Sequence, residues 1–219
     1  LARAIERGIY REIEFVPVQA LGDEVSTDHR LARRAKDIWL EGNETWFEFQ
    51  ERVEEGTLDA NPKPQSKMLV RVDRINQTER IRDIYSELGL DLAIVSSDRS
   101  LKDNLAAVSR AGYDDTCNGL IAVGMLGEGL DLPYLQIAVL HRPYQSFPIT
   151  LQFVGRICRM TGEYEGTAKL LAVPEQIQEH TQGLYELDAS WAELIPDLAD
   201  AAVGRERARR RFAKERWSV

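Results

Sequence analysis

Between residues 67 and 173 short apolar segments alternate with segments of helical spacing, and this alternation constrains the fold more than any other feature. Strands are predicted for the apolar segments 67–72, 91–97, 119–123, 136–141 and 168–173. Helices are predicted for the segments 77–88, 100–110, 149–159 and 175–187, with the second of them ending before Gly112. Strands that alternate with helices of about 10–15 residues indicate βα units, so we expect an α/β fold with a mostly parallel sheet.

The chain on either side of this core has a different pattern of apolar and charged residues. Residues 12–19 alternate apolar and polar side chains and predict a first strand. The charged stretch 27–55 predicts one or two amphipathic helices with a break near Gly42–Asn43, and two prolines make 61–66 a linker. We therefore expect a core at 67–173, a helical insertion at about 26–60 and a helical extension at 175–219.

Composition limits the classes of protein that remain. The formal net charge of −8 argues against a protein that coats nucleic acid without specificity, although a local basic path remains compatible with it. No apolar run approaches the roughly 20 residues that cross a bilayer, so no membrane partner is expected. The two cysteines, Cys117 and Cys158, form no CxxC pair, which fits a reducing, cytoplasmic compartment and excludes a cysteine zinc cluster.

The first segment that carries chemistry is VGMLGEGLDLP, residues 123–133, which directly follows a predicted strand. Loops at the carboxyl ends of parallel strands are where α/β proteins bind ligands. Its glycines allow the backbone to turn sharply and to approach a ligand, and Asp131 adds a carboxylate. An ordinary glycine-rich loop with a helix-capping aspartate explains this segment equally well when it is taken alone.

The second segment is QFVGRICR, residues 152–159. In a helix, Gln152, Arg156 and Arg159 share one face, while Gly155 keeps that face low enough for a partner to approach. Two neighbouring guanidiniums repel each other unless an anion lies between them, and a polyphosphate supplies such an anion. An arginine aimed at a γ-phosphoryl group stabilises the charge of its transition state. The alternative is a solvated basic helix face.

Together the two segments are more specific than either is alone. EGLDLP followed by a strand and then by QxxGRxxR resembles motifs V and VI of superfamily 2 helicases and translocases. Residues 67–72 resemble the motif IV strand of their second, C-terminal RecA-like domain, and residues 1–20 resemble the junction from the first domain. The sequences of these two segments are most similar in character to those of bacterial helicases related to restriction-enzyme motor subunits. The resemblance implies a RecA-like sheet flanked by helices, with extra helices after the first strand and at the C-terminus.

The resemblance also implies roles for single residues. Arg159 matches the arginine finger, and Arg156 matches the second arginine that reaches the γ-phosphate. Gln152 matches the polar residue that leads motif VI. Gly129 and Asp131 match the motif V residues on the nucleotide side of the cleft.

Ser96 and Gly124 fall at positions that face nucleic acid in the family. Val123 and Gly124 stand where many relatives carry Thr-Asp, so a hydroxyl contact to a phosphate is absent there. Either backbone N–H groups make that contact, or it is absent.

The chain lacks the other half of such a motor. No GxxxxGK[ST] loop occurs, because no lysine precedes serine or threonine, and no acidic box follows an apolar strand. The resemblance therefore implies that ATP and Mg²⁺ are used in the full-length protein together with an N-terminal RecA-like domain, and that this domain alone binds neither and is inactive. It favours DNA over RNA as the partner. A non-catalytic RecA-like scaffold that binds a partner is the alternative, and an unrelated phosphate-binding enzyme is a second one.

Overall fold

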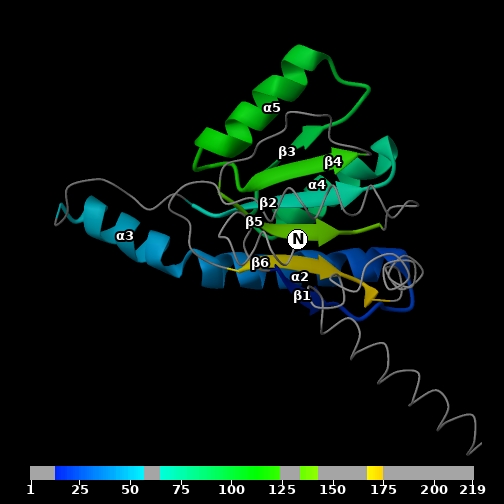
Figure 1. Ribbon diagram of the computed structural model, residues 1–219, viewed down its shortest axis with the longest axis horizontal. Helices are drawn as coiled ribbons and strands as arrows, with labels where there is room; N and C mark the ends of the chain where they lie inside the picture. The colour runs from blue at the N-terminus through cyan, green and yellow to red at the C-terminus, as the bar shows by residue number, and fades with distance from the viewer. Residues whose placement is uncertain (1–12, 57–64, 124–133, 143–166, 175–219) are drawn as a thin grey trace, which may run out of the picture.

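Six parallel strands form one sheet, in the order β1-β6-β5-β2-β4-β3. The computed structural model describes residues 13–56, 65–123, 134–142 and 167–174. In Figure 1 the arrows of the central strands point the same way, so their carboxyl ends share one edge of the sheet. The predicted parallel α/β sheet is confirmed, with strands β1 (Ile13–Pro17), β2 (Lys67–Val72), β3 (Leu92–Val95), β4 (Gly119–Val123), β5 (Leu135–Leu140) and β6 (Ala168–Ala172).

Helices cover both faces of this sheet. They are α2 (Glu24–Gly42), α3 (Glu44–Glu54), the short 3-10 helix η1 (Ile75–Gln77), α4 (Thr78–Glu87) and α5 (Leu101–Tyr113). The helices predicted at 149–159 and 175–187, and the rest of the helical extension to residue 219, lie outside the described residues. None of the helices within the described ranges is long and apolar enough to cross a membrane.

Strand β2 shows how one short sequence serves both faces. Its residues are all buried, and successive side chains point to opposite sides. Met68 and Val70 pack with the residues of α2 and α4, whereas Leu69 packs in the cluster that α5 covers. Burial on both faces explains why Met68, Leu69 and Val70 are consecutive apolar residues rather than alternating with polar ones. The two charged residues of the strand, Lys67 and Arg71, donate to backbone carbonyls.

Helix α2 packs on the sheet along its length. Leu31, Ala35 and Trp39 fall at intervals of four residues and are buried in the same cluster as β2. The predicted break near Gly42–Asn43 is confirmed, and α3 continues from it beyond the edge of the sheet (Figure 1). The helix begins at Glu24, earlier than predicted, because the Asp23 carboxylate caps it by accepting a hydrogen bond from the Ser26 backbone N–H at 2.8 Å.

Three polar side chains tie the end of α2 to the start of β2. The Trp39 indole N–H donates to the Ser66 carbonyl at 2.9 Å. The Asn43 amide donates to the Ser66 hydroxyl and accepts from its backbone N–H, both at 2.7 Å. Because Asn43 and Ser66 are buried, these bonds satisfy groups that would otherwise be costly to remove from water.

A buried lysine holds the amino end of β2. The Lys67 ammonium donates to the carbonyls of Cys117 at 2.6 Å and Asp114 at 2.9 Å, and to the Gln65 side chain at 3.1 Å. Three acceptors match the three protons of an ammonium. Burial lowers the pKa of Lys67, and nearby Asp115 and Asp114 oppose that shift.

The predicted end of the helix before Gly112 is wrong. Helix α5 runs on to Tyr113, and Gly112 lies buried inside it. Glycine costs about 1 kcal/mol relative to alanine in a helix interior, a penalty that packing against the sheet can outweigh. Ala111 of the same turn is completely buried in the core that α5 covers.

Gly119, the first residue of β4, lies where two strands come very close. A Cβ atom built at this position would be 2.0 Å from the Met68 carbonyl oxygen, which is backbone and cannot move aside. We expect Gly119→Ala to lower the free energy of unfolding by about 3 kcal/mol or more, at the upper end of overpacking effects. Urea denaturation would measure this loss.

Gly22→Ala is the matched control, because nothing lies within 4 Å of a Cβ atom there. Its stability should stay close to that of the unaltered chain. Equal stability of the two variants would show that β4 can shift away from β2 without penalty.

Candidate functional site at the carboxyl edge of the sheet

The strands that precede the two segments predicted to carry chemistry end at the same edge of the sheet. Strand β4 ends at Val123, directly before the segment 124–133, and β5 ends at Leu140, upstream of the segment 152–159. Both strands are parallel to β2 and flank it. The carboxyl edge at β4, β2 and β5 is therefore the candidate site, in agreement with the general position of ligands in parallel sheets.

Most of the predicted site residues lie outside the described part of the chain. These are Gly124, Gly129, Asp131, Gln152, Arg156 and Arg159. Their predicted roles stay predictions.

Ser96 is the predicted site residue that the structure describes. It follows β3 and is buried. Its backbone N–H donates to the Asn104 side chain at 3.2 Å, its carbonyl accepts from the same amide at 2.9 Å, and its hydroxyl donates to Asp98. Asn104 of α5 thus fixes the loop after β3, and the polar groups of Ser96 are engaged within that loop.

Sequence reasoning missed a group of buried polar residues beside the carboxyl end of β5. Asp28 of α2, Tyr85 of α4 and His141 after β5 are all completely buried. The His141 Nδ1 atom lies 2.8 Å from the Asp28 carboxylate, and the Tyr85 hydroxyl lies 3.1 Å from His141 Nε2. Because a carboxylate can only accept, Nδ1 donates, and both ring nitrogens are used. His141 is isolated in the sequence because its partners are remote along the chain.

Two arginines complete this group. The Arg142 guanidinium donates to both oxygens of Asp28, at 2.9 and 3.1 Å, and also to Glu24. Arg80 of α4 forms an ion pair with Asp28 at 2.8 Å. Burial lowers the pKa of Arg142. We call these six residues the Asp28 cluster: Glu24, Asp28, Arg80, Tyr85, His141 and Arg142.

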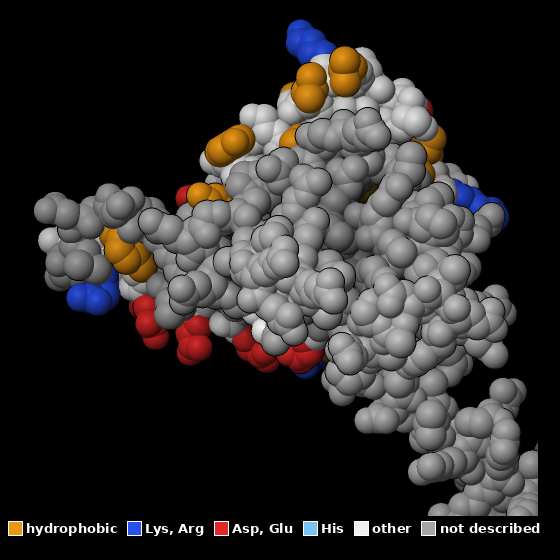
Figure 2. Space-filling model, in the orientation of Figure 1, with side chains coloured by type: hydrophobic (Ala, Val, Ile, Leu, Met, Phe, Trp, Pro, Cys, Tyr) orange, Lys and Arg blue, Asp and Glu red, His pale blue; other side chains and the backbone are white. Residues whose placement is uncertain are grey.

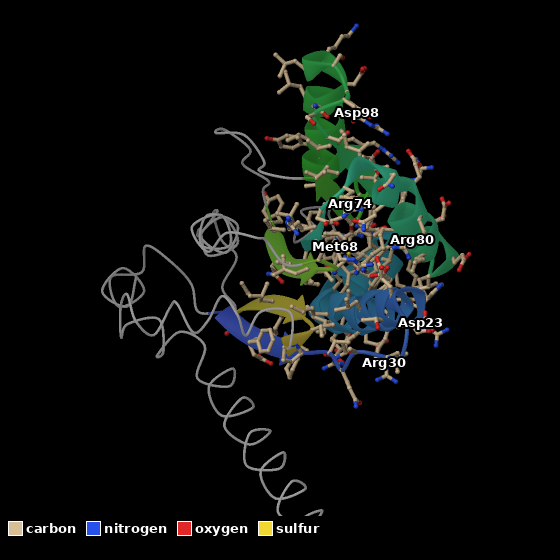
Figure 3. All side chains as sticks on the ribbon, turned by 90° about the vertical axis from the view of Figure 1, so that its right-hand side faces the viewer. Asp23, Arg30, Met68, Arg74, Arg80 and Asp98 are labelled. Carbon is tan, nitrogen blue, oxygen red and sulfur yellow. The ribbon has the colours of Figure 1, made fainter. Side chains whose placement is uncertain are left out.

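Figure 3 looks onto this side of the molecule, and shows Arg80 beside α2 with Asp23 below it and Arg74 and Asp98 above. Asp98 belongs to the loop after β3, and Arg74 to the loop after β2. The Arg74 side chain is 75% exposed, and its guanidinium lies 3.8 Å from the Asp73 carboxylate, an ion pair that is open to solvent. The edge thus combines an exposed cation with a buried, internally paired cluster.

Tyr85 gives the cluster a distinct response to alkaline pH. Burial and the neighbouring Asp28 charge raise the pKa of Tyr85 well above its ordinary value of 10. The unfolded chain releases this proton above pH 10 and the folded chain keeps it, so stability falls as pH rises. We expect a loss of about 1.4 kcal/mol per pH unit above pH 10 relative to a Tyr85→Phe variant.

Urea denaturation of both proteins at pH 8 to 11.5 measures this difference. Lys67 is common to both chains, so its opposite contribution cancels. Parallel stability curves for the two proteins would contradict the buried, protonated state of Tyr85.

A groove of about 590 Å³ lies elsewhere, along the edge strand β3 between α4 and α5. Three arginines line it, but Arg82 pairs with Glu79, Arg99 also pairs with Glu79, and Arg110 pairs with Asp91. Figure 2 shows exposed hydrophobic side chains in the region of α5. Leu101 and Leu105 of this helix are exposed. The paired charges give the groove no evident preference for a phosphate.

Within the described ranges, no three histidine, cysteine, aspartate or glutamate side chains are grouped so that they could hold a metal ion. The Asp28 oxygens are engaged by Arg80, His141 and Arg142, which occupy the positions that a metal would need.

Comparison with known proteins agrees with this architecture. The family model of the helicase conserved C-terminal domain matches residues 51–161, just over half of the chain. No curated protein matches in sequence.

Solved structures with the same fold include a fragment assigned as an HsdR subunit of a type I restriction enzyme from Vibrio vulnificus YJ016, with TM-score 0.56 and 18% identity, covering 81% of this chain and 35% of that one. Domain 2 of the DEAD-box helicase Mss116p, bound to an RNA duplex, has TM-score 0.51 and 13% identity, covering 78% of this chain and 59% of that one. The C-terminal domain of the DEAD-box protein Dbp5 has TM-score 0.50 and 11% identity, covering 81% and 84%.

At these identities the structural likeness shows the fold alone, while the family model spans both segments that follow β4 and β5. The chain therefore belongs to the helicase conserved C-terminal domain family, and its fold is that of the second RecA-like domain of superfamily 2 helicases.

Proposed function

We propose that this chain is the C-terminal motor domain of an ATP-dependent nucleic-acid helicase or translocase. The observation that carries the proposal is the family match over residues 51–161, which includes the segments 124–133 and 152–159. The parallel sheet supports it, because β4 and β5, the strands that precede these segments, flank β2 and end at one edge of the sheet. In this proposal the domain comprises residues 1–219, with its core at 67–173.

The residue roles follow the family pattern. Arg156 and Arg159 engage the γ-phosphate, and Gln152 contacts the nucleotide or relays between motifs. Gly129 and Asp131 line the nucleotide side of the cleft. Fixed guanidiniums stabilise charge that develops during phosphoryl transfer.

Ser96 and Gly124 are proposed to lie along the nucleic acid. The bonds of Ser96 to Asn104 and Asp98 limit its part to shaping the loop after β3, unless that loop rearranges. Exposed Arg74 at the same edge has a charge suited to a phosphate backbone.

ATP and Mg²⁺ enter the proposal through a second domain. The chain has no GxxxxGK[ST] loop, and the described residues group no metal ligands. An N-terminal RecA-like domain would supply the phosphate cradle and the Mg²⁺ ligands, and ATP would provide the free energy for closing the two domains. This chain would contribute its arginines to the shared cleft.

An ATPase assay tests the proposal. The chain alone and the chain joined to its upstream sequence are compared with no nucleic acid, with DNA and with RNA. We expect turnover only in the joined protein, and stimulation by DNA more than by RNA. A joined protein that binds ATP but shows no stimulated turnover would instead support the non-catalytic scaffold.

A further inference from the structure

One buried carboxylate receives cations from two different structural elements. Asp28 is completely buried. Its oxygens contact Arg142 and His141 at the end of β5 and Arg80 of α4. Its own helix, α2, is fixed to the sheet by apolar packing. Asp28 is therefore a stationary point to which the end of β5 is attached.

The attachment of Arg142 is specific in geometry. Its two terminal nitrogens lie 2.9 and 3.1 Å from the two Asp28 oxygens, the forked arrangement that an arginine forms with a carboxylate. Glu24, one turn earlier on α2, also accepts from it. On the other side, the Arg71 guanidinium of β2 donates to the Arg142 carbonyl. Side chain and backbone of this residue are thus both held.

A buried ion pair is a weak means of adding stability, because the cost of removing the charges from water offsets most of their attraction. Well-packed apolar residues could hold α2 against β5 as firmly. The charged pair adds a defined orientation, since a guanidinium donates to both oxygens of a carboxylate only within a narrow range of angles. The residue whose orientation they define is the one at which the chain leaves β5.

We propose that Asp28 is a positioning residue for ATP turnover, acting through Arg142 to fix the carboxyl end of β5. The inference rests on the proposed function, because the chain continues from this strand end toward Gln152, Arg156 and Arg159. Asp28 touches neither nucleotide nor nucleic acid in this scheme. In this scheme helix α2, for which the sequence suggests no function, carries the carboxylate that fixes the end of β5.

The test uses the complete protein and two arginines that share one carboxylate. Arg142→Gln removes the cation attached to β5, and Arg80→Gln removes the cation attached to α4. Both variants change the net charge equally and both leave Asp28 with remaining cationic partners. They differ in which element is released.

We expect Arg142→Gln to lower kcat by roughly 10- to 100-fold, the scale of a displaced catalytic geometry, with little change in the KM for ATP. Arg80→Gln should keep kcat near that of the unaltered protein at a similar loss of melting temperature. Asp28→Asn should resemble Arg142→Gln. The double variant Asp28→Asn with Arg142→Gln should be no slower than the slower single variant, because both remove one interaction.

Turnover is expressed per folded molecule, with the folded fraction measured by circular dichroism at the assay temperature. Equal kcat values for Arg142→Gln and Arg80→Gln would overturn the positioning role and leave the proposed function intact. An unaltered complete protein without nucleic-acid-stimulated turnover would overturn the proposed function, and the positioning role with it.

Discussion

Replacing Arg159 with alanine in the complete protein is expected to lower nucleic-acid-stimulated ATP turnover by about 10³-fold or more, the range associated with arginine fingers. The proposal places this guanidinium at the γ-phosphate, where it acts mainly in the transition state. Affinity for nucleic acid without nucleotide should change little. Arg159→Lys should not restore turnover, because an ammonium lacks the planar fork of donors.

Arg34→Ala provides a control for the loss of one positive charge, since Arg34 is exposed on α2. Turnover, strand affinity and melting temperature are measured on each variant. Near-normal turnover of Arg159→Ala with a melting temperature many degrees lower would make Arg159 a structural residue and end its catalytic assignment.

Asp28→Ala is expected to reduce the free energy of unfolding by about 3–5 kcal/mol, the cost of leaving buried charges without their partner. Arg142, Arg80 and His141 would then lose the completely buried carboxylate that all three contact. Urea denaturation of the 219-residue chain measures the loss.

Asp37→Ala is the matched control, because Asp37 lies on the exposed side of the same helix. It should change stability by no more than about 0.5 kcal/mol, as is usual for surface substitutions. If Asp28→Ala cost as little as Asp37→Ala, water would have to reach the cluster, and its description as buried would be wrong.

Much of the sheet could be predicted from hydrophobic pattern alone. Strands β2 and β4 begin and end at the predicted residues, since each is built around consecutive apolar residues, Met68–Val70 in β2 and Leu120–Val123 in β4. The strand predicted at 91–97 is shorter, with β3 covering Leu92–Val95. Its missing end follows from Asn104, whose amide draws the backbone of Ser96 into a loop, an interaction that local propensity does not encode.

The candidate site could be predicted only where residues act close together in sequence. Motif spacing indicates which segments leave β4 and β5, and the parallel sheet brings those two strand ends to one edge. The Asp28 cluster could not be found this way, because His141 is 113 positions from Asp28. In a single sequence an aspartate in a charged helix looks like any solvated acid, and burial alone distinguishes it.

The place of β1 in the sheet has a consequence for how the polypeptide acquires its structure during synthesis. The first described strand is paired with β6, the last one, and Phe15 lies opposite Leu170. A ribosome must therefore make the chain as far as Ala172 before β1 can find its neighbour. Until then the apolar residues of β1 have no sheet to join, and a growing chain with an unpaired strand is prone to wrong associations. The hydrogen bonds between β1 and β6 join two strands that are far apart in the sequence. We therefore expect this pairing to be a late event in folding, after the βα units between the two strands have formed.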